Sequence, residues 1–125
     1  MGKYIELTSS DFEATLNKGV SLVDFWAPWC GPCRSFAPVF EAAAEANPDM
    51  AFAKANTEAE EQLGAYFQIR SIPTLMVFRE QILLFNQAGA LPASALDELI
   101  GKVKALDMNE VRQEIAKAQS EGQPH

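Results

Sequence analysis

Two cysteines, Cys30 and Cys33, are the residues of this chain that most directly suggest chemistry. They are the only cysteines in the sequence, and two residues separate them. This spacing lets both sulfurs meet over a single turn, so the pair can open and close as a disulfide without refolding the chain. A strand-like run at 20–26 precedes the pair and a helix-like run at 35–46 follows it. Cys30 is therefore expected at a helix N-terminus, where unpaired N–H groups and the helix dipole favour a thiolate.

Two other uses of the cysteine pair stay open, a static disulfide and half of a zinc site. A structural zinc site needs four ligands, whereas the chain offers no other cysteine and a single histidine, His125. A static disulfide is uncommon in a chain that carries no secretory signal. The pair is therefore interpreted first as a redox dithiol, with no metal bound.

The composition indicates one globular domain of 125 residues with net charge −7. This charge and the lack of a basic cluster argue against nucleic acid and anionic membrane surfaces as partners. No apolar stretch reaches the length of a signal peptide core or a membrane span. We expect a cytoplasmic protein, in a compartment where thiols are kept reduced and a lone cysteine pair is more often catalytic than structural.

The order of the expected elements predicts the fold class. Strands are expected at 3–7, 20–26, 50–56, 74–78 and 82–86, and helices up to about residue 17 and at 34–46, 59–67, 92–105 and 108–120. Strands alternate with helices first, and a hairpin and a helix follow, which indicates an α/β fold with a central mixed β-sheet flanked by helices. We divide the chain into a domain at 1–106 and a C-terminal helical extension at 107–125.

Two charged residues fall within apolar strand-like runs. Asp24 shares its strand face with apolar neighbours, so desolvation should raise its pKa and let it exchange a proton with Cys33. An exposed or edge position is the alternative for Asp24. Lys54 would either pair with Asp24 and moderate its pKa, or pack its stem and extend its head into water.

The C-terminal extension has the pattern of an amphipathic helix. Asp107 and Glu110 form a capping pattern, and Val111, Ile115 and Ala118 fall on one helical face. We expect this helix to pack against its own domain or to fray, and we expect the protein to be a monomer. The alternative is a contact with a partner or with a second copy of the chain.

The ten residues from Asp24 to Cys33, DFWAPWCGPC, resemble the active-site segment of the thioredoxin family. Pro38, Lys54, the sequence Ile-Pro-Thr at 72–74, and Gly89 follow in the order and spacing of that family. The resemblance covers roughly residues 3–106. It implies a thioredoxin fold with an extra C-terminal helix, and a protein-disulfide reductase that maintains cell redox homeostasis by dithiol–disulfide exchange. No bound cofactor is implied beyond the redox-active disulfide Cys30–Cys33.

The resemblance also implies roles for individual residues. Cys30 is the attacking thiol, Cys33 resolves the mixed disulfide, Asp24 transfers a proton, and Lys54 tunes the pKa of Asp24. Pro73 would be cis and face the cysteines. The implied substrate-binding residues are Trp29, Gly31, Pro32, Ile72, Pro73, Gly89 and Ala90. The implied partners are disulfide-containing protein substrates and an NADPH-dependent thioredoxin reductase.

Two departures from the family pattern are visible, the tail beyond Leu106 and the turn at 79–81. Many relatives have an Asn-Gly-like turn where this chain has Arg-Glu-Gln, which offers no residue suited to positive φ. We therefore expect a longer hairpin or another type of turn. Two other functions stay open. One is a disulfide oxidase or isomerase, which the Gly-Pro dipeptide at 31–32 disfavours by resemblance, and the other is an interaction module that uses the tail.

Overall fold

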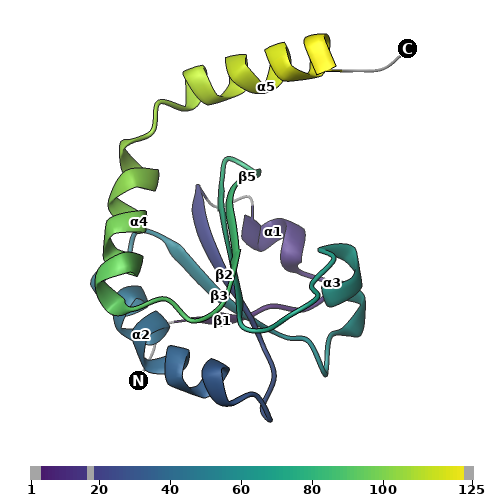
Figure 1. The fold of residues 1–125 in the computed structure, drawn as a ribbon, viewed down its shortest axis with the longest axis vertical. Helices are drawn as coiled ribbons and strands as arrows, with labels where there is room; N and C mark the ends of the chain where they lie inside the picture. Colours follow the sequence, from purple (N-terminus) through teal and green to yellow (C-terminus); the bar gives the residue numbers. More distant parts are fainter. Residues whose placement is uncertain (1–3, 17–18, 123–125) are drawn as a thin grey trace.

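The computed structural model describes residues 4–16 and 19–122 of the chain, and Figure 1 shows its elements around one sheet. In chain order they are β1 (Ile5–Glu6), α1 (Phe12–Leu16), β2 (Val20–Trp26), α2 (Gly31–Ala46), β3 (Ala51–Asn56), α3 (Glu61–Tyr66), β4 (Thr74–Arg79), β5 (Ile82–Ala88), α4 (Ala93–Ala105) and α5 (Met108–Gly122). These agree with the predicted elements to within a few residues. β1 is shorter than the predicted run at 3–7, of which Lys3 lies outside the described residues.

The sheet is mixed, as predicted, with the strand order β1-β3-β2-β4-β5. β3 pairs in parallel with β1 and β2, whereas β4 pairs antiparallel with β2 and β5. β2 therefore lies at the centre, and its register places Asp24 opposite Lys54 on one side and Leu75 on the other. A central strand covered on both faces is normally apolar throughout, which explains why a carboxylate in β2 is desolvated.

Helices cover both faces of the sheet and form two separate hydrophobic clusters. On one face, Phe36 and Phe40 of α2 and Leu96 and Ile100 of α4 pack over Leu22 and the residues beside it. The other face carries α1 and α3, whose apolar side chains join residues of the strands in a second cluster: Leu7, Leu16, Val23, Phe25, Ala53, Ala55, Leu63, Met76 and Phe78. The cysteine-bearing helix thus rests on one of two cores.

The turn between β4 and β5 differs from the sequence-based expectation. It is a tight two-residue turn, and its central residues Glu80 and Gln81 both have positive φ, 54° and 67°. This is the φ pattern of a type I′ hairpin turn, which glycine or asparagine normally supplies. The Glu80 amide donates to Gly19 O at 3.1 Å, and the Glu80 carboxylate forms an ion pair with Arg112 of α5. These contacts stabilise a positive-φ conformation that glutamate and glutamine disfavour.

The predicted extra C-terminal helix is present as α5, at the far end of α4 from the loop at 89–92 (Figure 1). The Asp107 carboxylate accepts hydrogen bonds from the Asn109 and Glu110 amides, so it caps the helix as the sequence suggested. Met108, its first residue, is the buried residue of this helix among those described. Met108 is 5% exposed, whereas Ile115 is 36% exposed.

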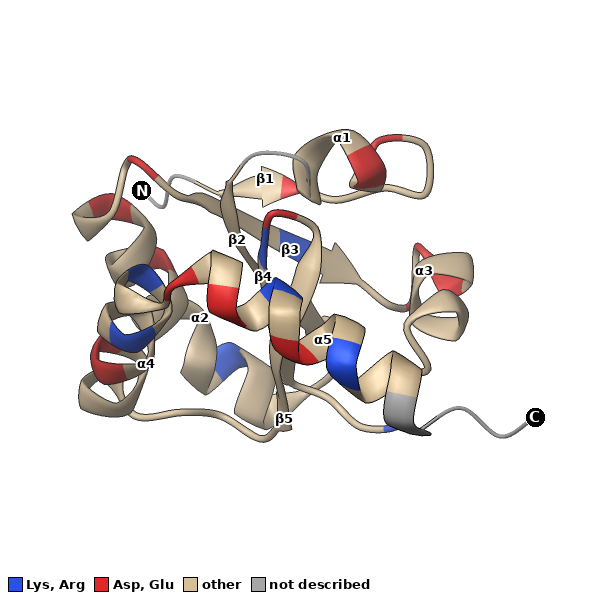
Figure 2. Ribbon diagram, turned by 90° about the horizontal axis from the view of Figure 1, so that it is seen from above, with Lys and Arg blue, Asp and Glu red and all other residues tan. Residues whose placement is uncertain are grey.

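Side chains from the β4–β5 turn hold the junction between α4 and α5. The Arg79 guanidinium donates to the carbonyl oxygens of Val103 and Leu106 at 2.8 and 3.0 Å. These carbonyls belong to the end of α4, where no further turn of helix supplies donors. Figure 2 shows α5 crossing this end of the β4–β5 hairpin. The turn and the tail, which looked like unrelated departures, are therefore in direct contact.

Candidate functional site

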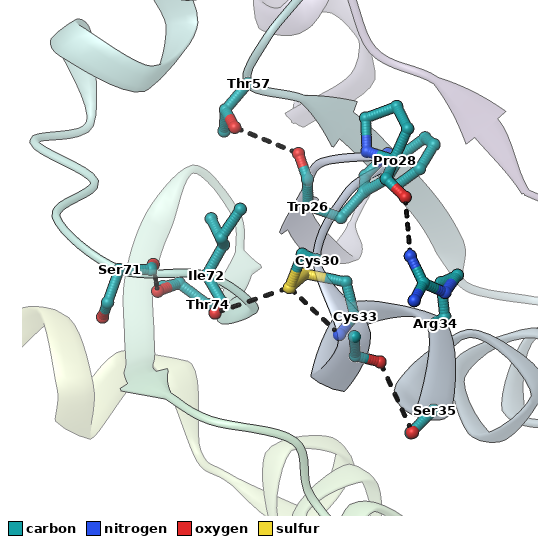
Figure 3. The surroundings of a disulfide bond; sticks show 11 residues. Trp26, Pro28, Cys30, Cys33, Arg34, Ser35, Thr57, Ser71, Ile72 and Thr74 are labelled. Atoms are coloured by element: carbon teal, nitrogen blue, oxygen red, sulfur yellow. Dashed lines mark hydrogen bonds between the residues drawn. A yellow bond between two sulfur atoms is a disulfide. The ribbon is translucent and has the colours of Figure 1, made fainter.

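Cys30 occupies the N-cap of α2, where the end of β2 passes through a short loop into the helix. Its backbone is extended, with φ −87° and ψ 113°, and its sulfur accepts a hydrogen bond from the Cys33 amide at 3.2 Å. The backbone amide of Cys30 donates to Ala27 O at 3.2 Å, and Arg34 donates to Pro28 O (Figure 3). A negative charge on the Cys30 sulfur would thus meet an N–H donor and the positive end of the α2 dipole, as predicted.

Cys30 and Cys33 form a disulfide, with Cα atoms 5.2 Å apart. The two residues are only 4% and 2% exposed. Gly31 and Pro32, the residues between them, are exposed. The structure therefore represents the oxidised state of the pair, which lies just beneath the surface.

The segment from 71 to 74 faces the cysteines from the beginning of β4. The Ile72–Pro73 peptide bond is cis, as the resemblance implied, and Pro73 is buried. The Ile72 carbonyl oxygen lies 3.8 Å from the Cys30 sulfur (Figure 3). In the disulfide neither sulfur carries hydrogen, so this is a contact now and becomes a hydrogen bond only when Cys30 is a thiol.

A second loop reaches the same place from the end of β5. The Gly89 amide donates to Pro73 O at 2.8 Å, and Gly89 has φ 103°, which favours glycine. Gly89 and its neighbour Ala90 are exposed. The structure thus brings Pro73, Ile72 and the loop at 89–90 to the end of the sheet where the disulfide lies.

Trp29 stands at the edge of an open groove beside the disulfide. The Trp29 side chain is 68% exposed, which is unusual for so large an apolar residue. With Ile72 it lines a groove of about 670 Å³ that runs along α3 and the segment at 68–71. The groove therefore opens beside two residues next to Cys30: Trp29, which precedes it in sequence, and Ile72, whose carbonyl oxygen contacts its sulfur.

Sequence reasoning did not include several residues that line the groove. Thr57, Glu61 and Arg70 come from the end of β3, from α3 and from the loop before Pro73. Arg70 lies close to the Ile-Pro-Thr motif in sequence, which was an available signal. Thr57 and Glu61 carry no such signal, because only the fold brings them to the groove.

Asp24 is fully buried within the central strand β2, with an exposed fraction of 0%. Neither of its carboxylate oxygens has a hydrogen-bond partner among the described residues. Burial raises the pKa of Asp24 from 3.8 to about 7, and the charge of Lys54 opposes that rise. The alternative of an exposed or edge Asp24 is wrong, and this carboxyl group can exchange a proton near neutral pH.

Lys54 lies opposite Asp24 in the sheet but does not form the expected ion pair with it. Its ammonium instead lies 3.6 Å from Glu41 Oε2 of α2, and over the rings of Trp26 and Tyr4 at 4.8 and 5.0 Å. The Lys54 residue is 7% exposed, so its head does not extend freely into water either. Nothing in the sequence indicated Glu41, since a glutamate on a helix is ordinarily solvated.

The described residues offer neither a cluster of metal ligands nor a membrane-spanning helix. No group of three or more His, Cys, Asp or Glu side chains gathers there in a way that could hold a metal ion. No helix within 4–16 and 19–122 is long and apolar enough to cross a membrane.

Comparison with known proteins gives a consistent result across the chain. The family model described as Thioredoxin matches residues 3–102. A protein of Streptomyces coelicolor named Putative thioredoxin 2 is 51% identical over 122 residues, which cover 97% of this chain and 91% of that protein. The thioredoxin of Bacillus subtilis is 35% identical over 99 residues, which cover 78% of this chain and 95% of its own.

Solved structures agree with these sequence relatives. A mutant thioredoxin from Halobacterium salinarum superimposes with a TM-score of 0.77 at 29% identity, over 84% of this chain and 94% of its own. The Streptomyces match must extend into α5, because it covers nearly the whole chain. The Bacillus and Halobacterium proteins leave a larger share of this chain unmatched.

Proposed function

The chain belongs to the thioredoxin family and is a thiol–disulfide oxidoreductase, and we propose that it is a general reductant of protein disulfides in which Cys30 attacks and Cys33 resolves. The observation that carries this proposal is the position of Cys30. It caps α2 beside an open groove, with a second cysteine one turn further along. An attacking thiolate is stabilised by such a donor-rich place at a helix N-terminus.

The reaction is a two-electron exchange. The Cys30 thiolate attacks one sulfur of the substrate disulfide, the substrate S–S bond breaks, and one substrate thiolate leaves. Cys33 then attacks the Cys30 sulfur of the mixed disulfide and releases the second substrate thiolate. The substrate is reduced, and the protein is left with the Cys30–Cys33 disulfide, the state that the structure describes.

We assign the proton transfer to Asp24. Cys33 must lose its proton before it can attack, and it is buried away from bulk water. A carboxyl group with a pKa of about 7 can accept that proton at neutral pH and return it when the disulfide is reduced. We assign to Lys54 the tuning of this carboxyl group, because its charge favours the ionised form.

Substrate binding is assigned to the exposed backbone and apolar side chains around Cys30. Ile72 and Trp29 line the groove, and the loop at 89–90 and the residues at 31–32 flank the disulfide. A small apolar rim of this kind suits brief contact with many different proteins, since weak encounters bury little surface. Pro73 positions the Ile72 backbone toward an extended substrate segment.

The proposal extends to the partners and setting of the reaction. Thioredoxins act on protein disulfides and are reduced by a thioredoxin reductase, and we propose an NADPH-dependent reductase as the electron donor. A reducing dithiol works where thiols are kept reduced, so we propose the cytoplasm as its location. We further propose a monomer, with a thioredoxin domain at 1–106 and an extension at 107–125.

The test is coupled turnover. With NADPH, a thioredoxin reductase and insulin as the disulfide substrate, the full chain should sustain NADPH oxidation, and Cys30→Ser should abolish it. Cys33→Ser should instead accumulate a mixed disulfide with the substrate, because the first step remains possible. A Cys30→Ser variant that keeps turnover would overturn the assignment. An interaction module would show no turnover in either form.

A further inference from the structure

Lys54 is held at one place by groups that come from three different elements. Its ammonium lies 3.6 Å from the Glu41 carboxylate of α2, and it lies over the ring of Trp26 in β2 and the ring of Tyr4 just before β1. The Lys54 side chain is 8% exposed and that of Glu41 is 32% exposed. An ammonium confined by two aromatic faces and a carboxylate has little freedom to move elsewhere.

This placement of Lys54 leaves the Asp24 carboxyl group without a paired cation. It lies opposite Lys54 in the register of β2 and β3, and Lys54 is the cation that acts on its pKa. Nevertheless both of its oxygens lack a hydrogen-bond partner among the described residues. A buried carboxylate without a partner is costly, so the protonated form is favoured as long as the ammonium stays with Glu41.

We propose that Glu41 is a positioning residue for the proton-transfer step: by binding Lys54, it draws the ammonium away from Asp24 and leaves the buried carboxyl group without a cationic partner. The proposal rests on the role assigned to Asp24 above. Glu41 touches neither cysteine in the described contacts, so its effect passes through Lys54. Tyr4 and Trp26 support the same placement of the ammonium.

Other charged groups around Lys54 are on elements that pack beside it. Glu6 of β1 is aligned with Lys54 in the sheet but is exposed, and Glu60 lines the same small cavity of about 170 Å³. The Glu60 carboxylate accepts hydrogen bonds from the amide and hydroxyl of Ser9, so it is committed elsewhere. Glu45, one turn after Glu41 in α2, is exposed.

The groups that face Asp24 from the other side add no competing charge in the oxidised protein. β4 presents Leu75 opposite it, and Cys30 and Cys33 carry no charge in the disulfide. Beside its burial, the charge that bears on the ionisation of Asp24 is Lys54, so the relevant balance is whether the ammonium pairs with Glu41 or lies free to act on Asp24. The oxidised protein is the state in which this balance can be measured without interference from a cysteine thiolate.

The sign of the effect follows from the freed ammonium. Glu41→Gln removes the carboxylate that holds Lys54 and frees the ammonium to act on Asp24. A cation freed to act on Asp24 favours the ionised carboxylate, so the pKa of Asp24 should fall below its value of about 7. Because Glu41 is partly exposed, water screens its charge, and we expect a fall of ~0.5–1 pH unit.

The experiment is an NMR titration of the Asp24 side-chain carboxyl carbon in the oxidised full-length protein. The matched control is Glu98→Gln, because Glu98 also pairs with a lysine, Lys102 at 3.3 Å, on the exposed face of α4. Glu41→Gln should lower the midpoint by ~0.5–1 pH unit, and Glu98→Gln should leave it within about 0.2 pH unit. Equal midpoints in Glu41→Gln and the unmodified chain would overturn the proposal.

A double-mutant cycle tests whether Glu41 acts through Lys54. Lys54→Gln alone should raise the midpoint, because it removes the cation that favours ionised Asp24. In that background Glu41→Gln should produce a smaller fall than in the unmodified chain. An equal fall in both backgrounds would show a direct effect of the Glu41 charge and would contradict a positioning role.

Asp24→Asn separates the failure of this proposal from failure of the assigned proton transfer. If Asp24 transfers the proton, Asp24→Asn slows resolution of the mixed disulfide and removes its pH dependence, whatever Glu41 does. Glu41→Gln should then shift the same pH profile downward by the amount seen in the titration. An Asp24→Asn variant with an unaltered profile would refute the role of Asp24, whereas an unaltered profile in Glu41→Gln alone would refute only the role of Glu41.

Discussion

The two ends of the sheet are built in different ways. At the disulfide end, backbone groups make the decisive contacts: the Cys33 amide to the Cys30 sulfur, and the Gly89 amide to the Pro73 carbonyl. At the opposite end, long charged side chains make them, with Arg79 reaching the end of α4 and Glu80 pairing with Arg112. One end fixes a buried pair of sulfurs, and the other attaches a largely exposed helix.

This difference implies that the two ends can be changed independently. At the disulfide end, β2, α2 and the segment with cis Pro73 set the positions of the residues around the sulfurs. The ion pair between α5 and Glu80 lies in the turn between β4 and β5, a full strand length from Pro73. Substitutions at one end should therefore alter turnover, and substitutions at the other should alter stability with turnover preserved.

The largest contrast should come from Cys30→Ser set against deletion of residues 107–125. Cys30→Ser should reduce turnover by at least roughly a thousand-fold, because a hydroxyl is a far weaker nucleophile than a thiolate. The deletion should leave turnover within about two-fold, since α5 contributes nothing to the groove or the disulfide. Insulin reduction measures the turnover of both variants. Loss of turnover in the truncated chain would show that the two ends of the sheet are functionally coupled.

Asp24→Asn should change stability strongly and in a pH-dependent way. The pKa of Asp24 is raised in the folded protein from 3.8 to about 7, so folding favours the protonated form and ionisation destabilises the fold. A difference of about 3 pH units corresponds to about 4 kcal/mol. The stability that the protonated form contributes is fully present below pH ~4 and is lost as the pH rises through about 7.

Asparagine mimics the protonated carboxyl at every pH. Asp24→Asn should therefore be more stable than the unmodified chain by on the order of 4 kcal/mol at pH 9, and about equal to it at pH 3.5. Urea denaturation at the two pH values measures this difference. Asp97→Asn, which neutralises an exposed carboxylate, is the control and should change little. Equal gains for Asp24→Asn at both pH values would contradict a raised pKa.

Arg79→Met should have the next largest effect, confined to stability. It keeps the apolar stem but removes hydrogen bonds from a charged donor to the carbonyls of Val103 and Leu106, at a cost of about 2 kcal/mol. Arg112→Met removes an exposed ion pair with Glu80 and an exposed hydrogen bond to Asn109, and it should cost less than about 1 kcal/mol. Urea denaturation ranks the two. An Arg112→Met cost as large as that of Arg79→Met would contradict this view of the junction.

Gln81→Gly should produce the smallest effect, a gain. Gln81 has φ 67°, a conformation that costs a residue with a side chain about 1–2 kcal/mol. Glycine avoids this cost, but its greater backbone freedom in the unfolded state offsets part of the gain. A net gain of ~0.5–1 kcal/mol is expected. Gln62→Gly, within α3, is the matched control and should instead destabilise by about 1 kcal/mol. A loss of stability in Gln81→Gly would show that the Gln81 side chain contributes more stability than its positive φ costs.

The same contrast explains how much could be predicted from the sequence. Hydrophobic patterns predicted the strands and helices, and the segment at 24–33 predicted the location of the site, because both depend on local spacing. The burial of Asp24 was predicted for the same reason, since β2 is apolar on both faces. The capping of α5 by Asp107 was likewise local.

Contacts between distant charged side chains were not predictable. Lys54 was expected to pair with Asp24, its neighbour in the sheet, but it binds Glu41 from a helix above the sheet. The turn at 80–81 was expected to avoid positive φ, yet Arg112, more than thirty residues away, pairs with Glu80 there. Such contacts depend on the packing of whole elements, which no local pattern encodes.

The most direct test of a reducing dithiol is the reduction potential of the Cys30–Cys33 pair, titrated in glutathione buffers. Trp26 ends β2 and Trp29 directly precedes Cys30, and their fluorescence should follow the reaction. We predict a value well below the cytosolic glutathione poise, and each ~30 mV corresponds to about 1.4 kcal/mol in favour of the disulfide. A value well above that poise would mean that the pair oxidises or isomerises disulfides, and it would contradict a general disulfide reductant.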